Sequence, residues 1–216
     1  MISDEQVKFY KTNGYLAVEN LFTQDEIESL QRVLDEFIER GKKLRESDDV
    51  IELEESHTPE NPRLRRIIRP DQQHPVFHDF VRRPKYVEVV SRLLGPNIRL
   101  HFSKINLKMG GFGAPVQWHQ DWAFYPHTNN DVLVSAVLLD DMVEDNGPLL
   151  VLPGTHKGPI FDHHHQGSFT GAIDVRSSGL DFSKAVKLMA PAGSLLVFHA
   201  RIVHGSDINR SSRNRR

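Results

Sequence analysis

The sequence contains no cysteine. This absence excludes disulfide frameworks, thiol nucleophiles and thiolate zinc sites, and leaves histidine and carboxylate side chains as the only strong metal ligands. Long apolar runs are also absent: no stretch approaches the ~18 residues of a membrane-spanning helix, and the N-terminus lacks the basic and apolar segments of a secretion signal. We therefore expect no membrane partner, and a cytoplasmic location is the simplest interpretation.

An excess of charge of one sign is missing as well. The 27 Lys and Arg residues stand against 29 Asp and Glu, a formal net charge of -2, so no basic field attracts nucleic acid and none is expected as a partner. With 216 residues, 38% hydrophobic and 26% charged, the chain suits one soluble domain spanning residues 1–216. No heptad pattern indicates a partner helix, and the oligomeric state stays open.

Two N-terminal helices are predicted from their start signals. Ser3 with Gln6, and Thr23 with Glu26, fit the capping box, in which a hydroxyl and a side chain three residues on satisfy free amides at a helix start. Between these helices, residues 15–18 follow a glycine and are predicted to form a short strand.

Residues 40–65 are charged and weakly periodic, and we interpret them as a surface excursion or lid. A third helix is predicted at residues 84–94, which completes a helical buttress and lid segment over residues 1–97. From residue 98 onward, short β-type runs alternate with Gly and Pro turns, as in a sandwich or jelly roll of antiparallel strands. The predicted strands lie at residues 99–109, 132–139, 149–152 and 194–203. The predicted fold is mainly β with flanking N-terminal helices and a β core over residues 98–216.

The most specific feature is a set of three metal-ligand side chains. His119 and Asp121 are two residues apart, so on a strand they point to the same face and can bind one metal together. His204 follows the apolar run 195–198, where a core strand would bring it to the interior. Two histidines and one carboxylate on one face of an octahedron leave three positions open, as a non-haem iron(II) oxygenase requires.

Further segments extend this pattern, and together they resemble the phytanoyl-CoA dioxygenase family. The chain reads Phe-Gly-Ala-Pro-Val-Gln-Trp-His-Gln-Asp at 112–121, Asp-Asn-Gly-Pro-Leu-Leu-Val-Leu-Pro-Gly-Thr-His-Lys at 145–157 and His-Gly-Ser at 204–206. With the opening segment at residues 9–16, the resemblance spans nearly the whole chain.

The resemblance implies the double-stranded β-helix fold, a cupin-like jelly roll. It also implies iron(II), 2-oxoglutarate as co-substrate and dioxygen, with release of succinate and CO2. The expected outcome is hydroxylation of an unactivated carbon in a small organic or lipid-like substrate, with His119, Asp121 and His204 acting through the iron. Related halogenases replace the metal carboxylate with a small residue, so the intact Asp121 argues against halogenation.

The far carboxylate of 2-oxoglutarate needs a fixed cation, and Arg suits it because the planar guanidinium can bind a carboxylate through two hydrogen bonds. In the family this Arg lies eleven positions beyond the distal His, which gives Arg215 when counted from His204. Arg213, on the same strand parity, is the alternative.

A second part of the co-substrate site is expected on residues 99–109. Lys104, Asn106 and Lys108 alternate, so they share one face of a strand. The family places a co-substrate contact at Asn106 and often a lysine at Lys108. The competing interpretation is that this face is turned to solvent and that the inward residues are Ile105, Leu107 and Met109.

The substrate is expected to bind near the aromatic residues that follow the metal pair. Phe124, Tyr125 and His127 are the candidates, while Trp122 is left unassigned because aromatics at such positions are more often core. His156 resembles a family position without metal-binding duty, and we interpret it as structural. The remaining histidines lack a partner at ligand spacing and are interpreted as structural or exposed: His57, His74, His78, His101, His163, His164, His165 and His199.

The sequence ends at Arg216, directly after the proposed carboxylate-binding Arg215, whereas the family fold continues with one more strand. That last strand is not in the sequence, so either the sequence represents less than the whole fold or the barrel is closed differently. If the strand is absent, we expect Arg215 to lie on a fraying terminus. Two other functions stay open at this point. One is a metal-dependent hydrolase or isomerase on a cupin-like barrel, which would not need the arginine, and the other is a non-catalytic binding domain.

Overall fold

The computed structural model describes residues 1–111 and 113–216, so Phe112, the first residue of one motif, lies outside the described residues. Both predicted capping boxes are confirmed, because the hydroxyls of Ser3 and Thr23 each accept a hydrogen bond from the amide three residues on, and their own amides donate to the side chains of Gln6 and Glu26. No helix of the described residues is long and apolar enough to cross a membrane. The helices are α1 (Asp4–Asn13), α2 (Gln24–Gly41), α3 (Pro70–Gln73), α4 (Pro75–Phe80) and α5 (Pro84–Leu94).

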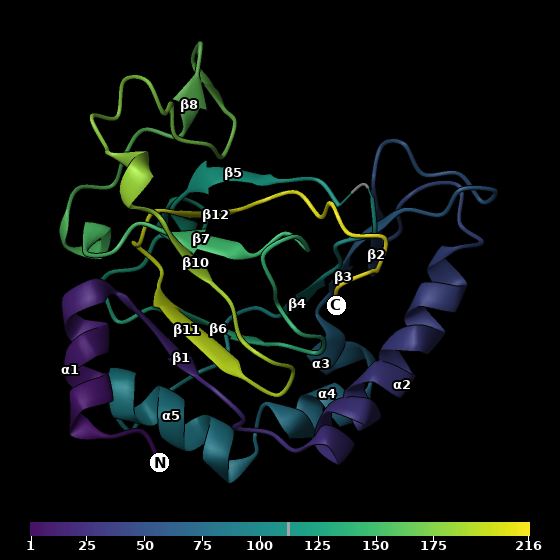
Figure 1. The fold of residues 1–216 in the computed structure, drawn as a ribbon, viewed down its shortest axis with the longest axis horizontal. Coiled ribbons are helices and arrows are strands. Elements are labelled where there is room, and N and C mark those ends of the chain that lie inside the picture. Colours follow the sequence, from purple (N-terminus) through teal and green to yellow (C-terminus); the bar gives the residue numbers. More distant parts are fainter. Residues whose placement is uncertain (112) are drawn as a thin grey trace.

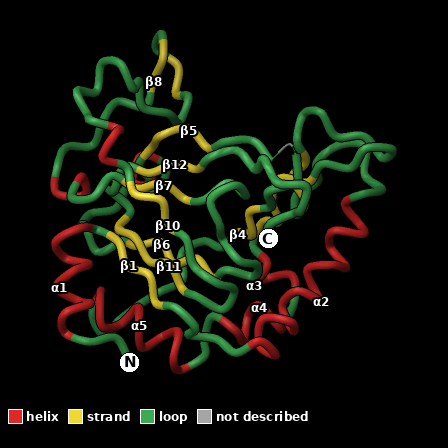
Figure 2. The backbone as a smooth tube through the Cα atoms, in the orientation of Figure 1, coloured by secondary structure: helices red, strands yellow, loops and turns green. Residues whose placement is uncertain are grey.

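The strands pair antiparallel throughout. They form sheets in the orders β1-β11-β6, β10-β7-β12-β5, β2-β3-β4 and β8-β9. The two main sheets lie towards the centre and the long helices lie along the lower and lateral edges of the view, as a mainly β fold with flanking helices requires, while the β8-β9 hairpin projects at the top (Figure 2). The strands are β1 (Tyr15–Val18), β2 (Ile51–Leu53), β3 (Leu64–Ile68), β4 (Lys104–Asn106), β5 (Val116–His119), β6 (Leu133–Val137), β7 (Leu149–Val151), β8 (His164–His165), β9 (Ser168–Phe169), β10 (Val186–Leu188), β11 (Leu195–His199) and β12 (His204–Ser206).

Strand β11 lies between the two main apolar layers, and its alternation shows how they are divided. Leu195 and Val197 join the cluster beneath the helices, whereas Leu196 and Phe198 join the cluster shared with β7 and β10. Because successive side chains on a strand point to opposite faces, one strand can serve both layers. The sheet β10-β7-β12-β5 therefore faces the sheet β1-β11-β6 across the second layer (Figure 1).

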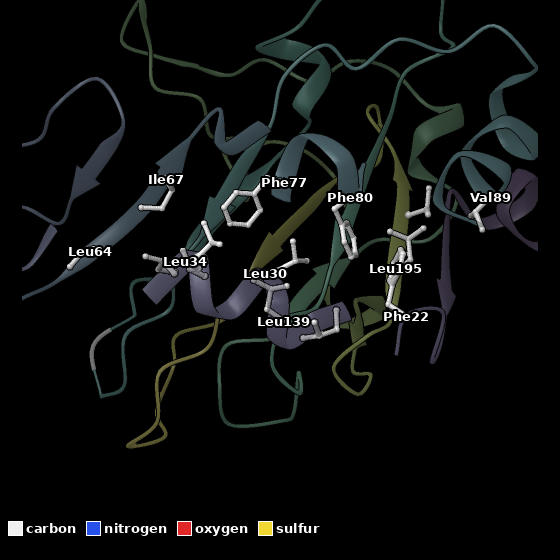
Figure 3. Packing of buried hydrophobic residues seen from close by; sticks show 14 of the residues in the cluster. Phe22, Leu30, Leu34, Leu64, Ile67, Phe77, Phe80, Val89, Leu139 and Leu195 are labelled. Carbon is white, nitrogen blue, oxygen red and sulfur yellow. The ribbon is translucent and has the colours of Figure 1, made fainter. Parts of the chain in front are cut away.

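The larger apolar layer fixes the helices against the sheets. Leu30 and Leu34 of α2 pack with Phe77 and Phe80 of α4, and this layer extends to Leu195 of β11 (Figure 3). Each such side chain contributes about 1.5–3 kcal/mol when it is fully removed from water. The apolar side of α2 therefore covers one side of the β core.

The interpretation of residues 40–65 as a surface lid is wrong for the strands within it. Ile51, Leu53 and Leu64 are 0%, 9% and 0% exposed and belong to the apolar layer under the helices. They lie on β2, which pairs with β3, and on β3, which also pairs with β4. The predicted division at residue 97 is wrong for the same reason, because β1, β2 and β3 all precede it and all belong to sheets. Only three residues of β2 alternate, which is too few for a recognisable period.

Candidate active site

The two candidate histidine ligands meet across a strand pair. His119 ends β5, His204 begins β12, and the two residues are direct partners in the antiparallel register. Their ring centroids lie 4.1 Å apart. The prediction that His204 closes the apolar strand is wrong: β11 ends at His199, a turn follows, and His204 opens the next strand.

Asp121 reaches the same point from a different element. It is the first residue of the short 3-10 helix η1 (Asp121–Ala123), not a strand residue as the sequence predicted. Its carboxylate lies 3.6 Å from Nε2 of His119 through one oxygen and 3.6 Å from Nε2 of His204 through the other. One ligand atom from each of the three residues lies within 4.8 Å of the others. Bonds of ~2.0–2.2 Å from these atoms can converge on one ion, so the residues fit a metal.

Both imidazole rings are oriented by their other nitrogen. Nδ1 of His119 lies 2.8 Å from the carbonyl oxygen of Gln117, and Nδ1 of His204 lies 3.0 Å from that of Ile202. A carbonyl can only accept, so Nδ1 carries the proton and donates, and the lone pair is placed on Nε2. Each ring therefore presents its ligand nitrogen toward Asp121.

The electrostatics favour the protonation states that a metal requires. Burial, followed by the charge of His119, lowers the pKa of His204 to about 4, so this ring is neutral at pH 7. Burial by itself would raise the pKa of Asp121, but its interactions with His204 and His119 hold it well below its usual value. Neutral imidazoles and an ionised carboxylate are the forms that bind metal ions.

Gln120, between the two ligands, anchors this segment and was missed by the sequence analysis. Its side chain is 0% exposed. It donates to the carbonyl oxygens of Pro159 (3.1 Å) and Arg201 (2.7 Å) and accepts from the amide of Phe161 (2.8 Å). Its own amide donates to Nε2 of His163 over 2.9 Å. The buried His163 is therefore structural, as interpreted, and helps to fix the chain between His119 and Asp121.

A second polar cluster lies two residues beyond His204 on β12. Nζ of Lys108 donates to Oγ of Ser206 (2.8 Å) and to the carbonyl oxygens of Ala114 (2.6 Å) and Asp207 (2.7 Å). Ser206 shares the face of β12 with His204 because they are two residues apart. Lys108 is 6% exposed, and burial, followed by the charge of Arg215, lowers its pKa to about 8.

Arg215 is held beside this lysine. Its backbone forms two 2.8 Å hydrogen bonds with Lys108, and its guanidinium donates to the carbonyl oxygens of Asn146 (2.9 Å) and Gly147 (2.7 Å). Burial lowers the pKa of Arg215 to about 10. The expectation that Arg215 lies on a fraying terminus is therefore wrong. Arg213, the alternative, is exposed.

The alternating residues of β4 settle which way each side faces. Leu107 is buried beneath the helices and Ile105 packs against the same layer, so the apolar residues point away from the metal triad. Lys108 contacts Ser206, and Lys104 interacts electrostatically with Asp121 and His204. The polar residues thus face the triad side, where Asn106 is exposed. Both interpretations of this strand were partly right, because each face has a role.

The candidate substrate residues lie at unequal distances from the triad. The ring of Phe124 meets that of His119 edge-on at 5.9 Å. Burial, followed by the charge of Asp121, raises the pKa of the Tyr125 phenol. His127 instead packs against His101, with centroids 5.1 Å apart, and bonds to the carbonyl oxygen of Tyr125 through Nδ1.

Comparison with known proteins now adds to this geometry. A family model described as phytanoyl-CoA dioxygenase matches residues 10–216. The chain belongs to the phytanoyl-CoA dioxygenase family. The family resemblance stated from the sequence motifs is thereby confirmed.

Three relatives illustrate the range of this family. A probable alpha-ketoglutarate-dependent hypophosphite dioxygenase of Stutzerimonas stutzeri is 37% identical over 98% of this chain and 75% of its own length. The peroxisomal phytanoyl-CoA dioxygenase of Rattus norvegicus is 29% identical over 98% of this chain, which spans 65% of that protein. The crystal structure of EctD from S. alaskensis with 2-oxoglutarate and 5-hydroxyectoine is 26% identical, with a TM-score of 0.82 over 99% of this chain and 73% of that one.

These findings establish the class of enzyme. The protein is an iron(II)- and 2-oxoglutarate-dependent dioxygenase, as its motifs predicted. The relatives do not favour a metal-dependent hydrolase, an isomerase or a non-catalytic binding domain. The likeness to EctD extends over the whole described fold, which agrees with strands at the centre and helices outside.

Proposed function

We propose that His119, Asp121 and His204 hold one Fe(II) ion and that the protein hydroxylates a carbon of a small organic molecule. The donor set is the two-histidine, one-carboxylate facial arrangement of non-haem iron oxygenases, which leaves positions for co-substrate and dioxygen. Bound iron supplies the activation of dioxygen at the expense of 2-oxoglutarate, which leaves as succinate and CO2. Because Asp121 occupies its ligand position, no halide position is open and hydroxylation is the expected outcome.

We also infer that the two facing sheets, β1-β11-β6 and β10-β7-β12-β5, form the double-stranded β-helix of this family. The observation that supports this is their shared apolar layer and their antiparallel pairing. The triad lies at one end of this layer, since the ring of Phe198 packs 4.7 Å from that of His204. Such an arrangement places rigid strands behind two of the three ligands.

The observation that carries the co-substrate assignment is a pair of cations without an anion. All hydrogen bonds of the Lys108 ammonium and the Arg215 guanidinium go to uncharged oxygens. In the described part of the chain no carboxylate forms an ion pair with either of them. Lys108 is buried and Arg215 is half-buried, and two such neighbouring cations are costly unless an anion compensates them. The far carboxylate of 2-oxoglutarate supplies that anion.

The position of this pair suits a dicarboxylate that is chelated at its other end. Ser206 lies two residues from His204 on β12, a separation of ~6.6 Å along a strand. A five-carbon diacid bound to the metal beside His204 can bridge that gap. Asn106 shares the face of Lys108 and lies within the same row, so its amide is available to the co-substrate as well. Arg215 is assigned ahead of the exposed Arg213.

The substrate would bind beside the free side of the triad. Phe124 packs against His119 and Tyr125 lies within the field of Asp121, so these two side chains flank the approach to the metal. His127 belongs to the same aromatic group through its ring contact with His101. The named relatives act on hypophosphite and on phytanoyl-CoA, so the family fold alone does not determine the scaffold.

The test is an anaerobic titration of the protein with Fe(II) and 2-oxoglutarate, followed through the weak visible charge-transfer band. The unaltered protein should develop the band, and Asp121→Ala should abolish it. Lys108→Met should raise the 2-oxoglutarate concentration for half-saturation about ten-fold or more. Lys8→Met, on the exposed side of α1, is the matched control and should bind normally. Absence of the band in the unaltered protein, or its persistence in Asp121→Ala, would overturn the proposal.

A further inference from the structure

The sheet face that carries Lys108 bears additional cations that the proposed chemistry does not use. Strands β3 and β4 lie side by side, with Arg66 opposite Asn106 and Ile68 opposite Lys104 (Figure 1). Directly opposed residues in an antiparallel pair share a face, and so do residues two apart on one strand. Arg66, Lys104 and Lys108 therefore all lie on the triad side of this sheet.

Lys104 is the cation of this face that interacts with the metal triad. Its ammonium interacts electrostatically with the carboxylate of Asp121 and with the ring of His204. It is exposed to solvent, and among the described residues its ammonium has neither a hydrogen bond nor an ion pair. A lysine with these properties presents a free charge beside the metal site. Lys108, two residues on, differs because its ammonium is fully hydrogen-bonded.

Arg66 adds to this charge. Its Nε lies 3.2 Å from one oxygen of Glu52, whose other oxygen lies 3.3 Å from Arg65. One carboxylate shared by two guanidinium groups leaves a net positive charge at this position. The phenol of Tyr125 lies within the fields of both Arg66 and Asp121. The cationic group and the metal triad therefore both act on the same tyrosine.

The charges can be compared with those of the bound groups. Fe(II) with the single carboxylate of Asp121 remains positive, and the two negative charges of 2-oxoglutarate are matched by Lys108 and Arg215. Lys104 and the Arg66 group are then left without compensation. A neutral substrate would displace water from these cations and provide no charge in return, which is unfavourable. An anionic substrate provides it.

We infer that the substrate carries a small oxyanion group, a carboxylate or a phosphorus oxyanion, which Lys104 binds with support from Arg66. This rests on the proposed function, because it supposes a substrate that binds beside a metal centre loaded with co-substrate. Lys104 anchors the charged end, and the reacting bond is directed to the side where Phe124 packs against His119. Lys104 is thus a specificity residue, distinct from the co-substrate pair Lys108 and Arg215.

The experiment uses the full chain loaded anaerobically with Fe(II) and 2-oxoglutarate, whose visible band reports on molecules that bind nearby. Propionate and hypophosphite are the anionic probes and propionamide is the neutral match, all titrated at constant ionic strength. In the unaltered protein both anions should shift the band at lower concentration than propionamide. Lys104→Met should weaken anion binding about ten-fold or more, and Lys104→Arg should restore most of it. Lys8→Met is again the matched control.

Three outcomes separate the two proposals. Failure of the band to form in unaltered protein contradicts the proposed function itself. If the band is normal but propionamide binds as tightly as propionate, only the proposal of an anionic substrate is wrong. The same conclusion follows if neither anion binds, or if Lys104→Met binds the anions as tightly as the unaltered protein does. The 2-oxoglutarate affinity of Lys104→Met should equal that of the unaltered protein. If it falls as far as anion binding does, Lys104 belongs to the co-substrate and the inference is also wrong.

Discussion

The ammonium of Lys108 donates a 2.8 Å hydrogen bond to Oγ of Ser206. The same hydroxyl accepts from the amide of Val116 at 3.2 Å, so it ties the lysine to both β12 and β5. These are the strands that carry His204 and His119. The position of the co-substrate cation is therefore coupled to the backbone that holds the metal ligands.

Replacing Ser206 by Ala should weaken 2-oxoglutarate binding about three- to ten-fold, because Lys108 loses one of its three acceptors and becomes less fixed. Titration of the visible band with 2-oxoglutarate measures the change. Ser194→Ala is the matched control, since Ser194 is also buried but its hydroxyl has no hydrogen-bond partner among the described residues. That variant should bind 2-oxoglutarate normally. Equal affinities in the two variants would contradict a role for Ser206 in positioning Lys108.

Gln120→Leu should destabilise the metal-free protein by about 2–4 kcal/mol, because two buried carbonyl groups and one amide lose their partner. Iron binding should weaken as well, since the segment between His119 and Asp121 is no longer anchored. Urea unfolding and an Fe(II) titration measure the two effects. Gln73→Leu, on exposed α3, is the control and should change neither. Loss of stability without any loss of iron affinity would limit Gln120 to a structural role.

The metal triad was predictable because its parts are local or distinctive. His119 and Asp121 are neighbours in sequence. In a chain without cysteine, only His, Asp and Glu can serve as strong metal ligands, so few other ligand sets are possible. The elements that carry them were predicted less well. Asp121 leaves the strand for a 3-10 turn and His204 opens a new strand, because the ligands are set by long-range pairing that a periodic pattern does not contain.

The rest of the site depends on contacts between distant segments. In the sequence Gln120 is an ordinary polar residue, and only the folded chain brings residues 159–161 to its side chain. Arg66 lies on β3, directly after the segment interpreted as a lid. The hydrogen-bond partners of the Lys108 ammonium are up to 99 positions away in sequence. Alternation identified the polar face of β4, yet only the packing of Leu107 beneath the helices shows that both faces of the strand are occupied.

Gly171→Ala should disturb the active site more than its effect on stability suggests. Gly171 has a φ of +72°, and an added Cβ would lie 2.5 Å from the ring of Phe124, which packs against His119. Gly179→Ala is a matched control, because its φ is +69° and its Cβ would meet nothing within 4 Å. Both variants should lose about 1 kcal/mol from left-handed backbone strain. Only Gly171→Ala should move the visible band of the Fe(II) and 2-oxoglutarate complex, and an identical band in both variants would refute this.

The stability of the metal-free protein should fall as the pH drops below about 6.5, and His199 should account for part of the loss. Burial, followed by the charges of His156 and Arg201, lowers the pKa of His199 to about 4. As the pH falls, His199 is therefore protonated near pH 6.5 in the unfolded chain, but only near pH 4 in the native protein. The contribution of His199 to the unfolding free energy is therefore fully present above about pH 6.5 and is lost as the pH falls from there towards 4.

His199→Gln should reduce this pH dependence without removing it, because burial also lowers the pKa values of His156, His163 and His204. Urea unfolding at pH 7.5 and pH 5 measures the difference in unfolding free energy for each protein. The control is His165→Gln, an exposed position on β8, which should lose as much stability between the two pH values as the unaltered protein. If His199→Gln loses just as much, the imidazole of His199 is protonated in the native protein and does not oppose folding in acid.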